Sequence, residues 1–153
     1  MRKALPVLLP DYQIIHICGK GKTDASIPNS NGYMQFEYVK DELTHLLAAA
    51  DLVISRAGAN SICEFLALQK PNILIPLPAK ASRGDQLLNA ASFEKQGFSF
   101  LLQEEDVTEE TLTQAVHHVF EHREGYVQAM LSNPASNAIE IIVNLCEELS
   151  KRK

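Results

Sequence analysis

The first two thirds of the chain alternate between two kinds of segment. Short apolar or alternating segments, rich in β-branched and aromatic residues, predict strands at 12–18, 33–38, 51–56, 72–77 and 98–102. Segments with the helical spacing of apolar residues lie between them, at 41–50, 60–69 and 85–96, and Gly97 ends the last one. Strands separated by helices of this length form βαβ units and a parallel sheet.

The remaining segments predict helices at both ends of the chain. Residues 1–10 indicate the end of an amphipathic helix that Pro10 stops, and 108–150 contains no strand candidate. Thr108 opens a helix with a capping pattern and two acids in its first turn, and 137–153 has apolar residues at helical spacing. Runs such as LVIS and ILIPL fit strands that helices cover on both faces. We therefore predict one domain, 1–153: a doubly wound α/β layer with a helical C-terminal tail.

Composition excludes several classes of protein. The 153 residues carry a formal net charge of -5, which argues against a general nucleic-acid binder. No stretch approaches the roughly 20 apolar residues that would span a bilayer. Three cysteines, Cys18, Cys63 and Cys146, lie far apart without zinc-ligand spacing, so we expect buried, structural side chains.

Ligands of doubly wound sheets bind beyond the carboxyl ends of the strands, so the loops 19–32, 39–42, 56–61 and 78–86 are the candidate sites. In 56–61, Gly58 permits a tight turn, and Asn60 or Ser61 can cap the following helix. The unpaired amides and the helix dipole would then favour an anion such as phosphate. The alternative is an ordinary βα loop that binds nothing.

Glu64 has two interpretations that the spacing supports equally. Ser61 and Glu64 match a capping box, in which the glutamate bonds back to the backbone at the start of the helix. The same carboxylate, at the mouth of a cleft, could instead accept both hydroxyls of a ribose. The two roles compete, because a carboxylate held at the cap is less free to bind a sugar.

The loop 78–86 offers further polar groups. Lys80 and Arg83 could add countercharge beside a bound phosphate, and Asp85 and Gln86 could bind sugar hydroxyls. The alternative makes Asp85 an N-cap or first-turn acid and leaves the basic pair solvated. None of the five histidines lies beside a carboxylate or nucleophile at a telling spacing, and no Walker loop, GxSxG or complete GxGxxG is present. We assign no catalytic residue and no metal site.

The segment ADLVISRAGANSICEFLALQKPNILIPLPAKASRGDQLLNAASFEKQGFS, 50–99, resembles the carboxyl-terminal half of the MurG family of peptidoglycan glycosyltransferases. The specific features are a strand followed by R-A-G-A, a glutamate a few residues on, a second strand ending in P-L-P, and then D-Q-L-L-N-A. The similarity extends over essentially the whole chain. Enzymes of this family transfer N-acetylglucosamine from UDP to an undecaprenyl-diphosphate-linked muramoyl-pentapeptide, lipid I, and so form lipid II.

The resemblance implies a GT-B architecture, in which the second of two Rossmann-like domains holds UDP-N-acetylglucosamine and no metal or other cofactor is needed. By resemblance, the backbone amides of 58–61 meet the diphosphate, assisted by Arg83, and Glu64 holds the ribose. Asp85 and Gln86, with Asn89 following in the motif, lie where the family contacts the N-acetylglucosamine, and the segment around Val39 and Lys40 lies where backbone groups meet the uracil. The full set of implied donor-binding residues is Gly58, Ala59, Asn60, Ser61, Glu64, Arg83, Asp85, Gln86, Asn89, Val39 and Lys40.

The chain also departs from the family pattern. The opening strand with its Gly-Gly-Ser loop is missing, and so is the acceptor domain with the histidine usually proposed as base. We therefore expect a truncated domain that lacks transferase activity alone and leaves a gap in the sheet between 12–18 and 51–56. Either the two flanking strands close up, or another chain fills the gap, since exposed strand edges favour association. The resemblance implies a cytoplasmic enzyme, peripheral at the inner face of the cell membrane, that meets its lipid-linked acceptor only through the missing domain.

Two alternative functions remain open. The chain could be the donor-binding subunit of a split, two-chain glycosyltransferase. It could also be a non-catalytic module that binds a nucleotide sugar.

Overall fold

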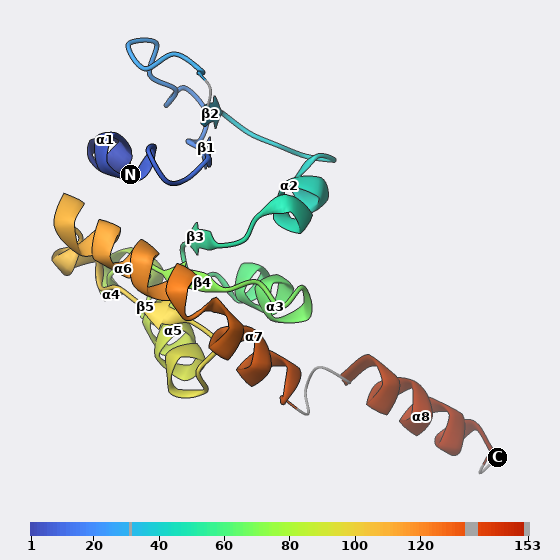
Figure 1. The fold of residues 1–153 in the computed structure, drawn as a ribbon. Coiled ribbons are helices and arrows are strands. Elements are labelled where there is room, and N and C mark those ends of the chain that lie inside the picture. The colour runs from blue at the N-terminus through green and yellow to red at the C-terminus, as the bar shows by residue number, and fades with distance from the viewer. Residues whose placement is uncertain (31, 134–137, 152–153) are drawn as a thin grey trace.

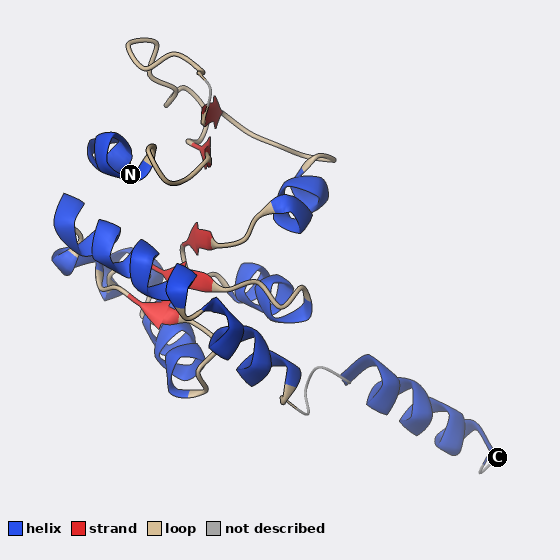
Figure 2. Ribbon diagram, in the orientation of Figure 1, coloured by secondary structure: helices blue, strands red, loops and turns tan. Residues whose placement is uncertain are grey.

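A computed structural model describes residues 1–30, 32–133 and 138–151 as parallel strands flanked by helices (Figures 1 and 2). The strands are β1 (Ile14–Ile17), β2 (Tyr33–Phe36), β3 (Val53–Ser55), β4 (Asn72–Leu74) and β5 (Phe100–Leu101). The helices are η1 (Arg2–Ala4), α1 (Leu5–Leu8), α2 (Leu43–Ala49), α3 (Ala59–Ala67), α4 (Ala79–Ser82), α5 (Asp85–Lys95), η2 (Glu104–Asp106), α6 (Glu109–Glu121), α7 (Arg123–Leu131) and α8 (Ala138–Lys151). All five predicted strands are present, each shorter than its apolar segment.

The strands form two separate parallel sheets. β1 pairs with β2, and β3, β4 and β5 form the second sheet in that order. β1 and β3 do not pair, which confirms the predicted gap between them and shows that the flanking strands do not close up. In Figure 1 the first sheet lies apart from the second, joined to it through α2.

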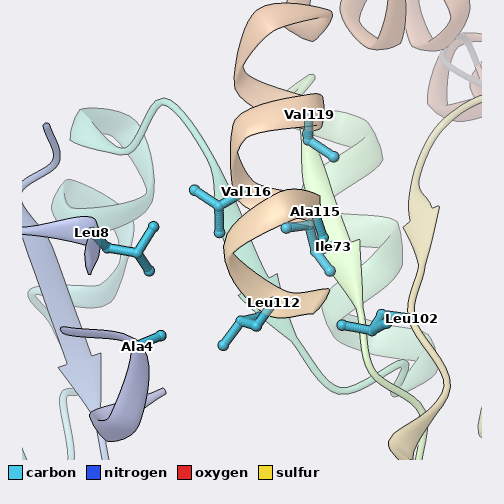
Figure 3. Close-up of a cluster of buried hydrophobic side chains, with 8 residues drawn as sticks. All are labelled: Ala4, Leu8, Ile73, Leu102, Leu112, Ala115, Val116 and Val119. Carbon is cyan, nitrogen blue, oxygen red and sulfur yellow. The ribbon is translucent and has the colours of Figure 1, made fainter. Parts of the chain in front are cut away.

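One face of the second sheet packs on α6 and on the N-terminal helices. Ile54, Ile73 and Phe100 lie in register on adjacent strands and point to this face. Figure 3 shows Ile73 beside the apolar side of α6, with Ala4 and Leu8 approaching α6 from the other direction. The buried members of this cluster are Ala4, Leu8, Ile73, Leu102, Leu112, Ala115, Val116 and Val119.

The opposite face packs on α2, α3 and α5. Leu74 and Leu101 are paired neighbours in the sheet, and their side chains point toward these helices. The buried members of this second cluster are Leu47, Ala57, Ile62, Phe65, Leu74 and Ala90. Helices therefore cover both faces, which confirms the predicted α/β layering, and their packing fixes where α3 and α5 begin.

Local signals explain most helix ends. Thr108 and Thr111 form the capping box expected at the start of α6, each side chain bonding the other's backbone N–H. Gly97, with φ 75°, follows α5 in the left-handed conformation that favours glycine. Within the described residues the helical tail is confirmed as α6, α7 and α8, whereas 134–137 and 152–153 lie outside them. Figure 1 shows α8 extending away from the rest of the chain. The short helix α4 was not predicted.

The expectation of three buried cysteines is wrong. Cys18 is half-buried, whereas Cys63 on α3 and Cys146 on α8 are exposed. Cys63 lies on the outer side of α3, because Ile62 and Phe65 occupy the side that packs on the sheet. Apolar neighbours in sequence therefore did not indicate burial for this residue.

Candidate functional site

The start of α3 presents unpaired backbone amides at the carboxyl end of β3. Ala57 is fully buried in the second cluster, and Gly58 is the N-cap in an extended conformation, with φ -67° and ψ 137°. The first bond across this boundary runs from Ile62 N to Gly58 O at 3.1 Å. The N–H groups of 59–61 therefore precede the hydrogen-bonded ladder of the helix, and no side chain caps them.

The predicted cap at Asn60 or Ser61 is wrong, and so is the capping-box interpretation of Glu64. Because Gly58 takes the N-cap position, Ser61 is already the third residue of α3. Glu64 then lies in the second helical turn, too far along to bond back to the cap. Its side chain is exposed and has no hydrogen-bond partner among the residues that the structure describes. The carboxylate is available to a ligand.

The segment between β4 and α5 is folded more tightly than a simple loop. Pro78 precedes α4, which ends at Arg83 in the left-handed conformation, with φ 55°. Gly84, with φ 88°, is the N-cap of α5, and Asp85 is the acid of its first turn, as the alternative interpretation had it. Within the described ranges, the side chains of Arg83 and Asp85 are exposed and make no hydrogen bond or ion pair.

Two amide side chains of α5 connect it to the neighbouring turns. Asn89 Nδ2 donates to Ala57 O at 3.0 Å, and Leu77 N donates to Gln86 Oε1 at 3.0 Å. Both side chains are half-buried. Sequence reasoning placed these two residues on the ligand, and it did not anticipate their bonds to the backbone.

The turn at Val39 and Lys40 completes the set of predicted residues. It lies at the start of α2, and Leu47 of that helix packs in the second cluster with Ala57. Val39 is half-buried and its backbone makes no hydrogen bond within the described part of the chain, whereas Lys40 O accepts from Leu43 N at 3.1 Å. Residues of α2, α3 and α5 pack in one cluster on the same face of the sheet, and the predicted positions lie in the turns before these helices or in their first two turns.

An ion pair that the sequence did not reveal joins the ends of three strands. Arg56, directly after β3, donates through Nη1 to Ile75 O at 3.1 Å, next to the end of β4. The same guanidinium pairs with both carboxylate oxygens of Glu104, which follows β5; Nη2 and Oε1 are 3.1 Å apart. The sequence signals for this pair were a cationic residue at the end of the predicted strand 51–56 and an acidic run, 104–106, after the predicted strand 98–102. Since both side chains are partly exposed, the pair orients the strand ends more than it stabilises them.

Two surface cavities lie away from these residues. One, of about 360 Å³, is lined mainly by Ala50, Asp51, Lys70, Pro71, Arg123, Glu124, Val127 and Gln128, at the amino ends of β3 and β4. The other, of about 320 Å³, is in the loop before β2. Among the described residues, no group of three or more histidines, cysteines or acids could hold a metal ion. Nor does any described helix have both the length and the apolar character needed to cross a membrane.

The fold and the site together define a class. A parallel α/β sheet with helices on both faces, whose polar loops and helix starts gather at the carboxyl ends of the strands, is the Rossmann-like C-terminal half of a GT-B glycosyltransferase fold. The chain belongs to the family described as Glycosyltransferase family 28 C-terminal domain, whose sequence pattern matches residues 2–145.

Similar proteins of known name agree with this assignment. Over 149 residues, the chain is 57% identical to the UDP-N-acetylglucosamine–N-acetylmuramyl-(pentapeptide) pyrophosphoryl-undecaprenol N-acetylglucosamine transferase of Lachnoclostridium phytofermentans. A transferase of the same name from Clostridium novyi is 54% identical over 151 residues. The matches cover 97% and 99% of this chain but 42% of each relative. The chain thus spans less than half the length of these relatives.

Solved structures show the same fold. The crystal structure of Acinetobacter baumannii MurG aligns with a TM-score of 0.69 and 25% identity, over 95% of this chain and 46% of that one. The glycotransferase of kitacinnamycin aligns with a TM-score of 0.65 and 21% identity, over 93% of this chain and 37% of that one. The second likeness concerns the fold alone.

Proposed function

We propose that the chain is the donor-binding half of a transferase that moves N-acetylglucosamine from UDP-N-acetylglucosamine to lipid I, the lipid-linked muramoyl-pentapeptide, forming lipid II. The family and the names of the similar transferases support this function. The observation that carries it is the open start of α3, where uncapped backbone amides follow the buried Ala57.

The diphosphate of the donor would bind at this helix start. The N–H groups of 59–61 and the helix dipole favour negative charge, and they are already in place before the ligand arrives. Arg83, exposed and without a partner in the described chain, adds a mobile positive charge. In a displacement at the anomeric carbon, these groups would stabilise the leaving diphosphate without a metal ion.

The rest of the donor would occupy the neighbouring loops. The Glu64 carboxylate would accept hydrogen bonds from the two ribose hydroxyls, since the competing role in a capping box is excluded. The backbone of Val39 and Lys40 meets the uracil, which suits the unbonded peptide groups of Val39. Asp85, Gln86 and Asn89 on α5 contact the sugar.

The acceptor and the base that deprotonates it would belong to the other half of the enzyme. The catalytic contribution of this chain is then donor binding, and we expect no transfer by the 153 residues alone. In the full-length enzyme, the acceptor half would bring this domain to the inner face of the cell membrane. The unpaired edges of β1 and β3 would promote self-association of the isolated chain.

Calorimetric titration with UDP-N-acetylglucosamine tests the function. We expect saturable binding that Glu64→Ala weakens about ten- to hundredfold, because hydrogen bonds to a charged group contribute about 1.5–3 kcal/mol. Glu148→Ala, which removes an equal charge from exposed α8, is the matched control and should bind as the unaltered chain does. Binding without any contribution from Glu64 would contradict the ribose assignment, and no binding at all would contradict the function. Formation of lipid II by the chain alone would contradict the assignment of acceptor binding and the base to the other half of the enzyme.

A further inference from the structure

We infer that Gln86 and Asn89 are positioning residues that each hold one backbone turn of the site and present opposite hydrogen-bonding groups to the donor sugar. For the identity of the ligand, this inference rests on the proposed function. The two residues are three apart on α5 and therefore lie on the same side of the helix. Each uses one end of its amide to bond the protein backbone, and the other end has no hydrogen-bond partner among the described residues.

Asn89 holds the turn that leads into α3. Its partner, Ala57 O, can only accept a hydrogen bond, so the amide nitrogen must be the atom that faces it. Ala57 is fully buried and directly precedes Gly58, the N-cap of the helix. This bond fixes the peptide from which the open amides follow, and it leaves Asn89 Oδ1 as an acceptor with no partner in the described structure.

Gln86 holds the exit from β4 with the opposite polarity. Its partner, Leu77 N, can only donate, so Oε1 is the atom that faces the backbone. Leu77 lies between Pro76 and Pro78, which have no N–H, so its amide is the one backbone donor of that stretch. The bond satisfies this donor and leaves Gln86 Nε2 as a donor with no partner in the described structure.

The fixed orientations define a recognition pattern for the sugar. Gln86 offers a donor, which suits a hydroxyl oxygen or the acetamido carbonyl of the donor sugar. Asn89 offers an acceptor, which suits a hydroxyl or acetamido hydrogen. UDP lacks the N-acetylglucosamine group. The preference for UDP-N-acetylglucosamine over UDP therefore reports on the unbonded ends of the two amides, and the affinity for UDP reports on the turn that Asn89 holds.

The experiment combines calorimetry with the backbone amide resonances of the unliganded chain. Gln86→Glu keeps the oxygen that bonds Leu77 N and replaces the outward donor with an acceptor. We expect an unshifted Leu77 resonance and a preference for UDP-N-acetylglucosamine over UDP that falls about tenfold, the effect of one lost hydrogen bond. Leu88→Glu places the same charge on the same helix at an exposed position and should leave the preference intact.

Asn89→Leu removes the bond to Ala57 O without adding a charge. We expect shifted Gly58 and Ala59 resonances and a UDP affinity that falls about tenfold. Asn89→Asp, which has the same shape but no donor, replaces it if the leucine variant does not fold. Unchanged Gly58 and Ala59 resonances with unchanged UDP affinity would overturn the positioning role.

A Gln86→Glu variant that keeps the full preference for UDP-N-acetylglucosamine over UDP would contradict the role of Gln86 Nε2 as a hydrogen-bond donor to the sugar. If the unaltered chain bound neither ligand, the proposed function itself would fail. If instead the unaltered chain bound both ligands and the variants did not show the expected losses, only this inference would be contradicted.

Discussion

At the residue scale, the polar side chains of the site divide by what they already bind. Gln86 and Asn89 each bond a backbone group, and Arg56 pairs with Glu104. Glu64 and Arg83 have no partner in the described part of the chain. The first group maintains the shape of the loops and the second is left to the ligand, so substitutions in the two groups should differ in their effects on structure and on binding.

His16 illustrates a side chain whose role is structural. It is half-buried, with Nδ1 3.1 Å from the Tyr33 hydroxyl. Burial lowers the pKa of His16 below 6.5, and the charges of Arg2 and the N-terminal amine lower it further. The unfolded chain therefore binds the proton more tightly, and the contribution of His16 to stability is present above its unfolded pKa and is lost as the pH falls below it.

We expect that His16→Gln reduces the dependence of the free energy of unfolding on pH between about pH 7 and pH 5. Urea denaturation at several pH values measures this dependence. His45→Gln, at an exposed position, controls for the loss of one imidazole. The assignment is wrong if the unaltered chain and His16→Gln lose stability in parallel over that range.

At the element scale, the start of α3 shows where local sequence rules stop. Serine and asparagine are better N-caps than glycine, so the sequence favoured Asn60 or Ser61. The structure starts the helix at Ala59, because Ala57 is buried against Ile62, Leu74 and Ala90 in the second cluster. Such contacts join residues far apart in the chain and are not visible in a short motif. At α6 the Thr108 prediction was confirmed, because the threonine side chain itself accepts the hydrogen bond from Thr111 N.

The two helix starts should respond differently to the loss of a hydroxyl. Thr108→Ala removes a working cap and should cost about 1 kcal/mol in the free energy of unfolding. Ser61→Ala, inside α3, should change it by less than about 0.5 kcal/mol. Urea denaturation of both variants checks the pair. A loss at Ser61 as large as that at Thr108 would restore the capping interpretation of the α3 start.

At the scale of the whole molecule, the alternation of strands and helices in the sequence predicts the α/β fold. It does not predict the division of the strands into two sheets. The gap was expected only from resemblance to a family, since no pattern within the chain indicates which strand would lie on the side of β1 away from β2. Ile14 N and Cys18 N bond to the β2 side, so the backbone groups of Ile15 and Ile17 face the open edge. The side chains of these two residues are also exposed, by 47% and 44%.

This edge should make the isolated chain associate. We expect a sedimentation coefficient that rises with concentration, and Ile15→Lys should reduce the rise, because a charge on an edge strand opposes pairing. Leu88→Lys, at a 74% exposed position on α5, is the control for adding a charge in place of an apolar side chain. Equal effects of both variants, or a chain that stays monomeric throughout, would show that the β1 edge does not mediate association.

The most direct test of donor binding is a titration with UDP followed through the backbone amide resonances. We expect the resonances of Ala59, Asn60 and Ser61 to shift together and saturate, because the diphosphate accepts hydrogen bonds from these N–H groups. Saturable shifts confined to the cavity beside Lys70 and Arg123, with the start of α3 unchanged, would contradict the proposed site.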